Sequence, residues 1–412
     1  MDDIAREALE LVERCSSEII DFARELVAIP SVNPPGDERG VAEAIAARMA
    51  ELGLGAPQVH CKENHRPNLV ARVPCAREGR TLMYSGHMDT KPIGRRDQWA
   101  SDPFDPAVRD GLLYGLGSSD MKSALAAMTY AGKAVSVLAA ELQGELQLVF
   151  VADEEAGGHL GARFLSQECG LQADVALLGE PCGLSKDWEY LSLVSRGETC
   201  FRLRVHGTQM HSSISDLVPS VNANLQLAEV LLRLDRDLTI HYEPHPLCPD
   251  GITVTPAVLM SGGVYYGILP GEAEFRTEIR TLPGMTLNGV RADVEGFVEM
   301  LRGENPHLRV EVEFEPPPFE WIAPMEFPPA HPLVACLEQA SEQVLGARPP
   351  RAAFPAWTDA RFLTEIAGIP AIPAFGPGLL TVIHRPNEHV SVKAIVEAAK
   401  IYALTAVHYL RA

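Results

Sequence analysis

The stretch GELQLVFVAD, residues 144–153, is the feature that most restricts the fold of this chain. Its near-continuous apolar character is typical of a strand that is buried on both faces, as in parallel sheets covered by helices. An apolar, small-residue helix pattern at 121–140 precedes it, and a helix near Ala162 and the strand-like DVALLG at 174–179 follow it. This alternation of strands and helices predicts an α/β layer fold with a largely parallel central sheet flanked by helices.

The pattern changes near Ser192, where LSLVSRGETCFRLRVHG alternates apolar and polar residues. Such alternation predicts an antiparallel strand with one solvated face. Further strand patterns at 251–260, 273–280 and 308–314, with helix patterns at 218–234 and after Met285, predict an α+β module with two helices on one face of an antiparallel sheet. The proline-rich EPPPFEWIAP is interpreted as the linker that leads back. We therefore expect one domain at 1–190 and 317–412, interrupted by an inserted domain at 191–316.

Charge and composition limit the partners of the chain. Its 412 residues contain 35 Lys and Arg against 55 Asp and Glu, a formal net charge of -20. Nucleic acids and anionic membranes are therefore poor partners. The opening MDDIAREALE lacks the apolar core of a secretory signal, and no apolar stretch approaches the ~18 residues of a membrane span. Eight scattered cysteines without a C-x-x-C pair favour reduced thiols, so we expect a cytoplasmic protein without an all-cysteine zinc site.

Acidic side chains recur where the predicted strands end. SGHMDT projects His87 and Asp89 from the same side of a strand end, because successive side chains alternate. GLGSSDMK places Asp120 at a glycine-flanked turn, VADEEAGG ends a strand with three acids including Glu154 and Glu155, and LLGEP ends another strand with Glu180. Taken singly, these residues could be a solvated strand end, a helix N-cap and a loop tip. Ligand sites of parallel α/β sheets form at the carboxyl ends of the strands, so their joint occurrence there predicts a site.

The residue types indicate the chemistry of that site. Imidazole and carboxylate ligands without a thiolate suit zinc, cobalt or manganese, and a carboxylate shared by two ions is typical of dinuclear hydrolases. GPGLLTVIHRPNEHV adds His384 and His389, either of which could instead be a surface histidine. The sequence therefore predicts a metal site built from His and Asp/Glu.

The order of the motifs resembles a known family. SGHMDT, WASDPF, GLGSSDMK, ADEEAGG, LGEP, GTQMHSS, PAWTDARF and IHRPNEHV follow one another from about residue 20 to the end. In this they are similar to the dinuclear metallohydrolases that include acetylornithine deacetylase, succinyl-diaminopimelate desuccinylase, aminoacylase and glutamate carboxypeptidase. The resemblance implies a catalytic domain with an inserted lid domain that also forms the contact of a homodimer.

The resemblance also implies a role for individual residues. His87, Asp120 and Glu180 would hold one metal ion, and His384, Asp120 and Glu155 the other, with Asp120 bridging the two. Asp89 would orient the His87 ring, and Glu154 would be the general base. His211 resembles a histidine that the other subunit contributes to the oxyanion, and Arg280 resembles an arginine that binds a substrate carboxylate.

Three positions depart from the family pattern. Leu116 stands where arginine is frequent, and Gly267, preceded by Tyr265 and Tyr266, stands where asparagine usually contacts the substrate. Trp357 precedes Thr358 where small residues are usual; it either packs in the core or reshapes the pocket for a flat or apolar group. The predicted substrate contacts are Arg280, Trp357, Tyr265, Tyr266 and Thr358.

The predicted function is hydrolysis of an amide C–N bond in a small carboxylate-bearing molecule by a homodimer with two divalent ions, zinc before manganese or cobalt. An N-acyl amino acid deacylase or a dipeptidase- or carboxypeptidase-like enzyme fits this description. One alternative is a metal-dependent hydrolytic deaminase of an aromatic amino acid analogue. Another is a catalytically silent, metal-bound ligand-binding protein. The presence of Glu154 beside a complete ligand set argues against this alternative.

Overall fold

The computed structural model describes residues 2–411, which form two compact units. Unit 1 combines Met1–Val194, Phe327–Phe354 and Thr358–Ala412, and unit 2 combines Ser195–Glu326 with Pro355–Trp357. The chain thus returns to unit 1 at Phe327, beyond the predicted boundary at 316. The short second visit to unit 2 at 355–357 has no local signal in the sequence.

The central sheet of unit 1 is parallel over most of its width. Its six strands lie in the order β1-β2-β6-β3-β7-β18. The strands β6, β3, β7 and β18 are parallel to one another, whereas β1 and β2 pair antiparallel at one edge. Their bounds are β1 Gln58–Cys61, β2 Pro67–Pro74, β3 Arg77–His87, β6 Gln143–Val151, β7 Val175–Leu178 and β18 Ala371–Ile372. β6, which lies inside the sheet with its second half buried, confirms the interpretation of the 144–153 stretch.

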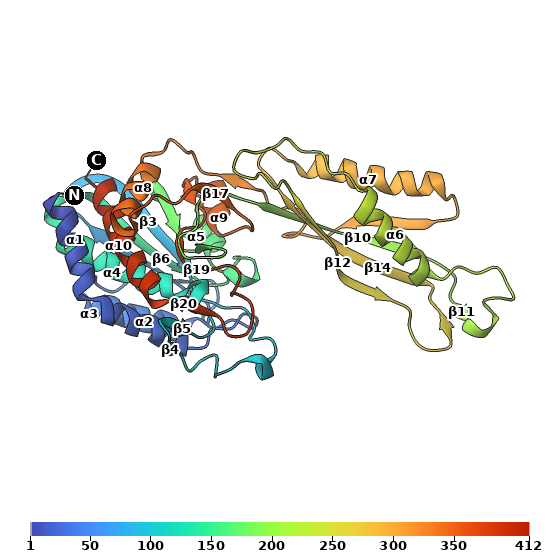
Figure 1. The fold of residues 1–412 in the computed structure, drawn as a ribbon, viewed down its shortest axis with the longest axis horizontal. Helices are drawn as coiled ribbons and strands as arrows, with labels where there is room; N and C mark the ends of the chain where they lie inside the picture. The colour runs from blue at the N-terminus through green and yellow to red at the C-terminus, as the bar shows by residue number, and fades with distance from the viewer. Residues whose placement is uncertain (1, 412) are drawn as a thin grey trace. The chain divides into compact units, whose positions relative to one another are not determined.

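Helices flank this sheet, as Figure 1 shows for α4 and α10. The helices of unit 1 are α1 Asp3–Arg14, α2 Ser16–Ala28, α3 Arg39–Glu51, α4 Ser123–Val137, α5 Ala162–Glu168, α8 Pro332–Leu345, α9 Ala360–Glu365 and α10 Val392–Tyr409. The apolar α4 packs against β2, β3 and β6 and against α10. The N-terminal segment consists of two helices because the Cys15 N–H bonds to Val12 O, three residues back, which closes the first helix.

Short strands complete the chain. They are β4 Ala107–Arg109, β5 Leu112–Tyr114, β8 Pro181–Gly183, β9 Leu191–Ser195, β11 Met210–His211, β13 Ile268–Leu269, β16 Met325–Glu326, β17 Arg351–Phe354, β19 Gly376–Leu379 and β20 His389–Ser391. Within unit 1, β20 pairs with β5 and β19 with β8, so the C-terminal segment that carries His384 is tied to the body of unit 1 at both ends.

Unit 2 is an α+β layer, with the α6 and α7 labels beside its sheet in Figure 1. Its antiparallel strands lie in the order β12-β14-β10-β15, with β12 Thr253–Gly262, β14 Glu272–Thr281, β10 Gly197–His206 and β15 Arg309–Phe314. The helices are α6 Ala223–Asp237 and α7 Leu287–Glu304. Alternate residues such as Phe201, Leu203 and Phe275 are buried against apolar residues of both helices. The charged residues that alternate with these apolar residues lie on the opposite face of the sheet, as the sequence predicts.

No helix among residues 2–411 combines the length and the apolar character needed to cross a membrane.

Candidate functional site

Three neighbouring strands of the unit 1 sheet end at the candidate site. His87 is the last residue of β3, Glu154 and Glu155 follow β6, and Glu180 follows β7. Because these strands are adjacent and parallel, their carboxyl ends lie at the same edge of the sheet. All four side chains belong to buried residues. The edge therefore concentrates one imidazole and three carboxyl groups away from bulk water.

Two glycines allow the segment around Asp120 to approach this edge. A Cβ on Gly86 would lie 2.4 Å from Met121 Cε, and a Cβ on Gly179 would lie 2.6 Å from Met128 Cε. A larger residue at either position would push the start of α4 away from the sheet. Asp120 precedes α4 with extended backbone angles (φ -127°, ψ 92°) and does not cap the helix. Its carboxylate is therefore available for the site.

The structure brings the predicted ligands together as two groups that share Asp120. In the first group, His87 Nε2 lies 3.0 Å from Asp120 Oδ1 and 3.7 Å from Glu180 Oε1. In the second group, His384 Nε2 lies 3.2 Å from Asp120 Oδ2 and 3.3 Å from Glu155 Oε2. The two oxygens of Asp120 thus face different groups. This is the arrangement expected of a carboxylate that bridges two ions.

The distances within each group fit a metal ion. Ligand atoms at ~2.0–2.2 Å from a tetrahedral zinc ion lie about 3.3–3.6 Å from one another. In each group, the candidate ligand atoms all lie within 4.8 Å of one another, and the imidazole-to-carboxylate distances are 3.0–3.7 Å. The His384 side chain is 44% exposed, whereas the Asp120 and Glu155 side chains are nearly buried. The second group is therefore open on one side.

The electrostatics of the cluster also call for cations. Burial raises the pKa of Glu154 and of Glu180 well above the ordinary value; the charge of His87 opposes the rise, and neighbouring carboxylates add to it. Burial lowers the pKa of His384, but its bonds to Asp120 and Glu155 outweigh this and raise it to about 10. Among residues 2–411, the basic groups in contact with the acids of the two ligand groups are His87, His384 and Lys91, whose Nζ lies 3.2 Å from Glu155 Oε2. Two divalent ions would supply the missing positive charge.

Asp89 holds more than the His87 ring. The His87 Nδ1 atom lies 3.0 Å from the backbone oxygen of Asp89 and 3.5 Å from its Oδ1. The Asp89 carboxylate accepts the backbone N–H groups of Glu154 and Glu155 at 3.2 and 3.1 Å, and the amide of Asn33 at 2.8 Å. The predicted orienting residue therefore also fixes the backbone that carries both glutamates.

The sequence analysis did not single out two buried acids, Glu388 and Asp359. Glu388 Oε1 accepts the N–H groups of Ser119 and Asp120 at 2.9 and 3.1 Å, and so holds the shared ligand. Its only signal was its place in IHRPNEHV. Asp359 is buried, and burial raises its pKa to about 7, with the charge of His87 opposing the rise. Its position in PAWTDARF was the only available indication.

His389, a possible ligand, and Thr358, a predicted substrate contact, lie apart from the ligand groups. His389, on β20, pairs with Tyr114 of β5, and its Nδ1 lies 2.8 Å from the backbone oxygen of Asn387, so it is outside both groups. Thr358 is buried, and its hydroxyl oxygen accepts the N–H of Ala360 at 3.3 Å. Neither arrangement was apparent from the spacing of the motifs.

In unit 2, Arg280 and Trp357 meet at one carboxylate, that of Glu198. Trp357 Nε1 donates to Glu198 Oε2 at 2.7 Å, and Arg280 Nη1 lies 3.1 Å from the same oxygen. Arg280 Nε also donates to Glu278 Oε1 at 2.6 Å. The half-buried Trp357 is therefore held by a polar contact rather than by apolar packing alone.

Within one subunit, Trp357 lies apart from Tyr265 and Tyr266, with which the sequence analysis grouped it. The partner of Trp357, Glu198, pairs with Arg280 at one end of the β10–β14 ladder, whereas the tyrosines follow the end of β12 that pairs with the other end of β14. From Glu198 along β10 to His206 the distance is about 27 Å at ~3.4 Å per residue. Sequence position gave no strand register, so the two ends of the sheet could not be told apart.

The tyrosines instead lie beside His211. β11 pairs with β13, and the Ser212 N–H bonds to Gly267 O at 2.9 Å, which ties the Tyr265–Tyr266 turn to the histidine. Tyr265 and Tyr266 are 76% and 92% exposed. Gly267 has φ +82°, which is a left-handed conformation. Glycine adopts this conformation most easily, and asparagine adopts it more easily than most other residues. The departure at Gly267 thus accompanies a tight turn.

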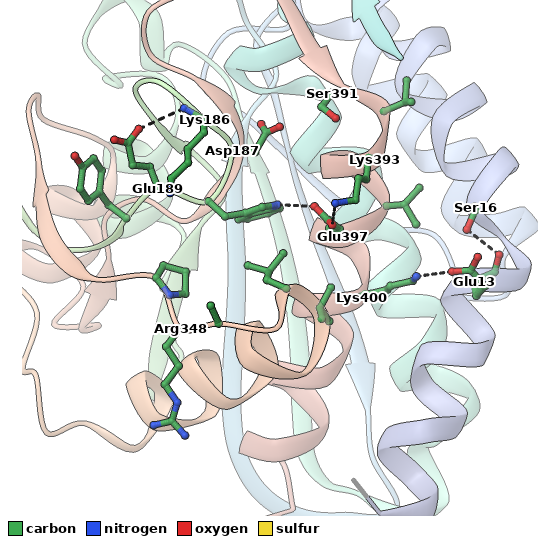
Figure 2. A pocket seen from close by; sticks show the side chains of 18 of the residues that line it. Glu13, Ser16, Lys186, Asp187, Glu189, Arg348, Ser391, Lys393, Glu397 and Lys400 are labelled. Carbon is green, nitrogen blue, oxygen red and sulfur yellow. Dashed lines mark hydrogen bonds and ion pairs between the residues drawn. The ribbon is translucent and has the colours of Figure 1, made fainter. Parts of the chain in front are cut away.

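A cavity of about 1020 Å³ in unit 1 contains none of the predicted site residues. Figure 2 shows its wall, where Lys393 points to Glu397 and Lys400 points to Glu13. Its charged groups include both signs, and several already form ion pairs within the wall. The size of a cavity therefore does not locate the site. The two ligand groups that share Asp120 locate it.

Most of the chain matches a known protein family. Residues 83–408 match the family described as Peptidase family M20/M25/M40. The chain belongs to peptidase family M20/M25/M40. As a member of it, the chain is a metal-dependent amide-bond hydrolase with a dinuclear metal site.

Individual relatives cover almost the whole chain. The chain is 28% identical over 396 residues to a succinyl-diaminopimelate desuccinylase of Parvibaculum lavamentivorans, covering 93% of each. It is 28% identical over 421 residues to an N-formyl-4-amino-5-aminomethyl-2-methylpyrimidine deformylase of Bacillus subtilis, covering 95% of this chain and 94% of the relative. The fold of this family member resembles the di-peptidase Dug1p of Saccharomyces cerevisiae, with a TM-score of 0.76, 15% identity and full coverage of both chains.

Proposed function

We propose that this hydrolase cleaves the amide bond of a small N-acylated amino acid or a dipeptide-like molecule. The observation that carries the proposal is the pair of ligand groups sharing Asp120, with Glu154 next to the ligand Glu155 but outside both groups. The relatives support the substrate class, since their names include a desuccinylase, a deformylase and a dipeptidase. All of these remove a group from nitrogen.

We assign the ligands as the geometry groups them. His87, Asp120 and Glu180 would hold one ion, and His384, Asp120 and Glu155 the other. Zinc is the preferred ion for this imidazole and carboxylate set, and manganese or cobalt would also fit. Bound there, a pair of such ions lowers the pKa of water and polarises a carbonyl group.

Glu154 is the proposed general base. It is buried at the edge of the ligand groups, and its backbone is fixed by the Asp89 carboxylate. Burial raises its pKa, with the charge of His87 opposing the rise, and a carboxyl group with a raised pKa is suited to taking up and returning a proton. Glu154 would take a proton from the attacking water and pass it to the leaving nitrogen. The acyl group leaves as a carboxylate and the other product as an amine.

Residues of unit 2 would recognise the substrate. Arg280 would bind a substrate carboxylate through its guanidinium group, which can make two parallel hydrogen bonds. His211 is exposed, and its Nδ1 accepts the Ser213 N–H at 3.2 Å, which leaves Nε2 for a substrate oxygen. We propose that His211 acts in the site of the partner subunit. Tyr265 and Tyr266, which are tied to the same turn, would reach that site with it.

A homodimer through unit 2 is supported by its surface. β12 is an edge strand of the sheet, and Leu259 and Met260 on it are 59% and 57% exposed. Leu225 and Leu232, one heptad apart on α6, are each 70% exposed. An unpaired edge strand next to exposed apolar side chains is a surface suited to pairing with a second copy. We place the protein in the cytoplasm on a different ground, because all eight cysteines are free thiols.

A hydrolysis screen tests the proposal. The metal-free protein is loaded separately with zinc, manganese and cobalt and assayed on N-acyl amino acids, dipeptides and aromatic amines. We expect turnover of at least one N-acyl amino acid or dipeptide, and none in Glu154→Gln loaded with the same ion. Release of ammonia from aromatic amines alone would instead establish a deaminase.

A further inference from the structure

Glu198 is a charged residue of unit 2 to which the family resemblance assigns no role. Its side chain is only 6% exposed, yet it lies on the sheet face opposite the apolar core. Strand register places it there, because Glu198 pairs directly with Arg280 across the β10–β14 ladder. Trp357 Nε1 donates to its Oε2 at 2.7 Å, and Cys200 Sγ lies 3.5 Å from its Oε1. Glu198 is therefore a buried anion at the centre of a small cluster.

The cluster already neutralises the guanidinium group. Arg280 contacts Glu198 at 3.1 Å through Nη1 and Glu278 at 2.6 Å through Nε, so two carboxylates surround one cation. A substrate carboxylate added to this arrangement would be the third anion beside one guanidinium. Like charges at such distances oppose binding, more so where the groups are shielded from water. The substrate carboxylate therefore has to replace one of the two acids.

Glu198 is the contact that can be exchanged. The Glu278 contact has hydrogen-bond geometry at Nε, whereas Nη1 is buried and makes no properly directed hydrogen bond despite its proximity to Glu198. Charge attraction thus holds Nη1 of Arg280 near Glu198, but its N–H donors are not satisfied. An incoming carboxylate could satisfy them. When Arg280 leaves, Glu198 keeps the Trp357 indole N–H as a donor, so its charge does not lose every partner.

We propose that Glu198 is a specificity-determining residue that competes with the substrate carboxylate for Arg280. The inference rests on the proposed role of Arg280 in binding that carboxylate. In the free enzyme, Glu198 holds Arg280 and Trp357 in one cluster. A carboxylate ligand takes its place on Nη1 of Arg280, and Trp357 senses the exchange because it donates to the same Glu198 oxygen. Ligands without a carboxylate leave the cluster unchanged.

The test uses succinate and its neutral analogue succinamide as probes of the metal-loaded protein. Binding is measured by calorimetry in the parent, Glu198→Gln, Arg280→Gln and the double variant. We expect Glu198→Gln to bind succinate on the order of tenfold more tightly, the scale of one charge-assisted hydrogen bond. The affinity of Glu198→Gln for succinamide should stay within about twofold of that of the parent. In the Arg280→Gln background, Glu198→Gln should give no gain, since the competition needs the guanidinium group.

The two proposals fail in different ways. Unchanged succinate affinity in Arg280→Gln overturns the carboxylate-binding role of Arg280. Weaker binding in Arg280→Gln, together with no gain or a loss in Glu198→Gln, preserves that role and overturns the competition.

A second measurement needs no substitution at Glu198. Succinate should change the tryptophan emission of the parent but not of Trp357→Phe, while succinamide changes neither. An equal response in both proteins would mean that Trp357 does not sense the exchange, and would overturn the inference even if Glu198→Gln failed to fold.

Discussion

Asp89→Asn is expected to damage the metal site without removing a single ligand. The two carboxylate oxygens of Asp89 receive three donors, the N–H groups of Glu154 and Glu155 and the amide of Asn33. Asparagine keeps one acceptor oxygen. If that oxygen replaces Oδ2, which serves Asn33 and Glu155, the new NH₂ group faces the N–H of Glu154.

The cost follows from this count. One charge-assisted hydrogen bond is worth about 1.5–3 kcal/mol, and leaving a buried N–H unpaired costs about 1–3 kcal/mol. Since the remaining bonds also lose their charged acceptor, we expect unfolding free energy to fall by about 3 kcal/mol in the metal-free protein. Loss of a group that orients ligands typically weakens metal binding by about 10–100-fold, and the same range is expected here.

Glu388→Gln provides a matched control. Glu388 is equally buried and also holds the backbone next to a ligand, but a single oxygen, Oε1, receives both N–H groups. A glutamine amide oxygen can accept both, so these two bonds should be kept. We expect its effect on metal affinity to be several times smaller than that of Asp89→Asn.

The assay combines urea unfolding of the metal-free proteins with competition against a chromogenic chelator for metal affinity. Measuring both separates loss of the fold from loss of the site. The reasoning would be refuted if Asp89→Asn unfolded within about 0.5 kcal/mol of the parent, the usual range of neutral surface changes, and bound metal normally. Equal damage by Glu388→Gln would show that buried charge matters and the number of accepted bonds does not.

Four further outcomes follow from the site and the proposed assembly. Glu154→Gln should keep both metal ions by elemental analysis and lose about 10²–10⁴-fold in turnover, and near-normal turnover would remove it from the mechanism. Mixing inactive His211→Ala subunits with inactive Glu154→Gln subunits should restore part of the activity, because one site of the heterodimer has both residues; no recovery in verified heterodimers would confine His211 to its own subunit. Removing the metals with a chelator should lower the melting temperature by roughly 5–10 °C if they are bound at ~100 times their Kd, and re-addition should restore it. Leu232→Asp should shift the protein to monomers in sedimentation, whereas an unchanged dimer would place the interface elsewhere.

Much of the fold was predictable because it follows from local patterns. The apolar run of β6 indicates a strand buried in a parallel sheet, and the alternation in β10 indicates a sheet with one solvated face. Both patterns arise from the geometry of a single strand, so no knowledge of its neighbours is needed. The convergence of His87, Glu155 and Glu180 was also predictable, since parallel strands end at one edge. The amphipathic pattern of the N-terminal residues continues across Cys15, so this pattern alone does not show that α1 and α2 are separate helices.

Other features depended on the tertiary structure. Whether Asp120 caps a helix or serves two ligand groups was decided by how closely α4 approaches Gly86 and Gly179. The return of residues 355–357 to unit 2, which brings Trp357 to Glu198, depends on a contact between segments 159 positions apart.

The sequence by itself therefore determined the strand and helix pattern, the acids at the strand ends and the ligand types. The tertiary structure decided the strand register, which pairs Glu198 with Arg280 and separates Trp357 from Tyr265 and Tyr266. The physical reason is that residue type and periodicity are properties of a short segment. Register and long-range hydrogen bonds arise only when segments far apart in the chain pack together.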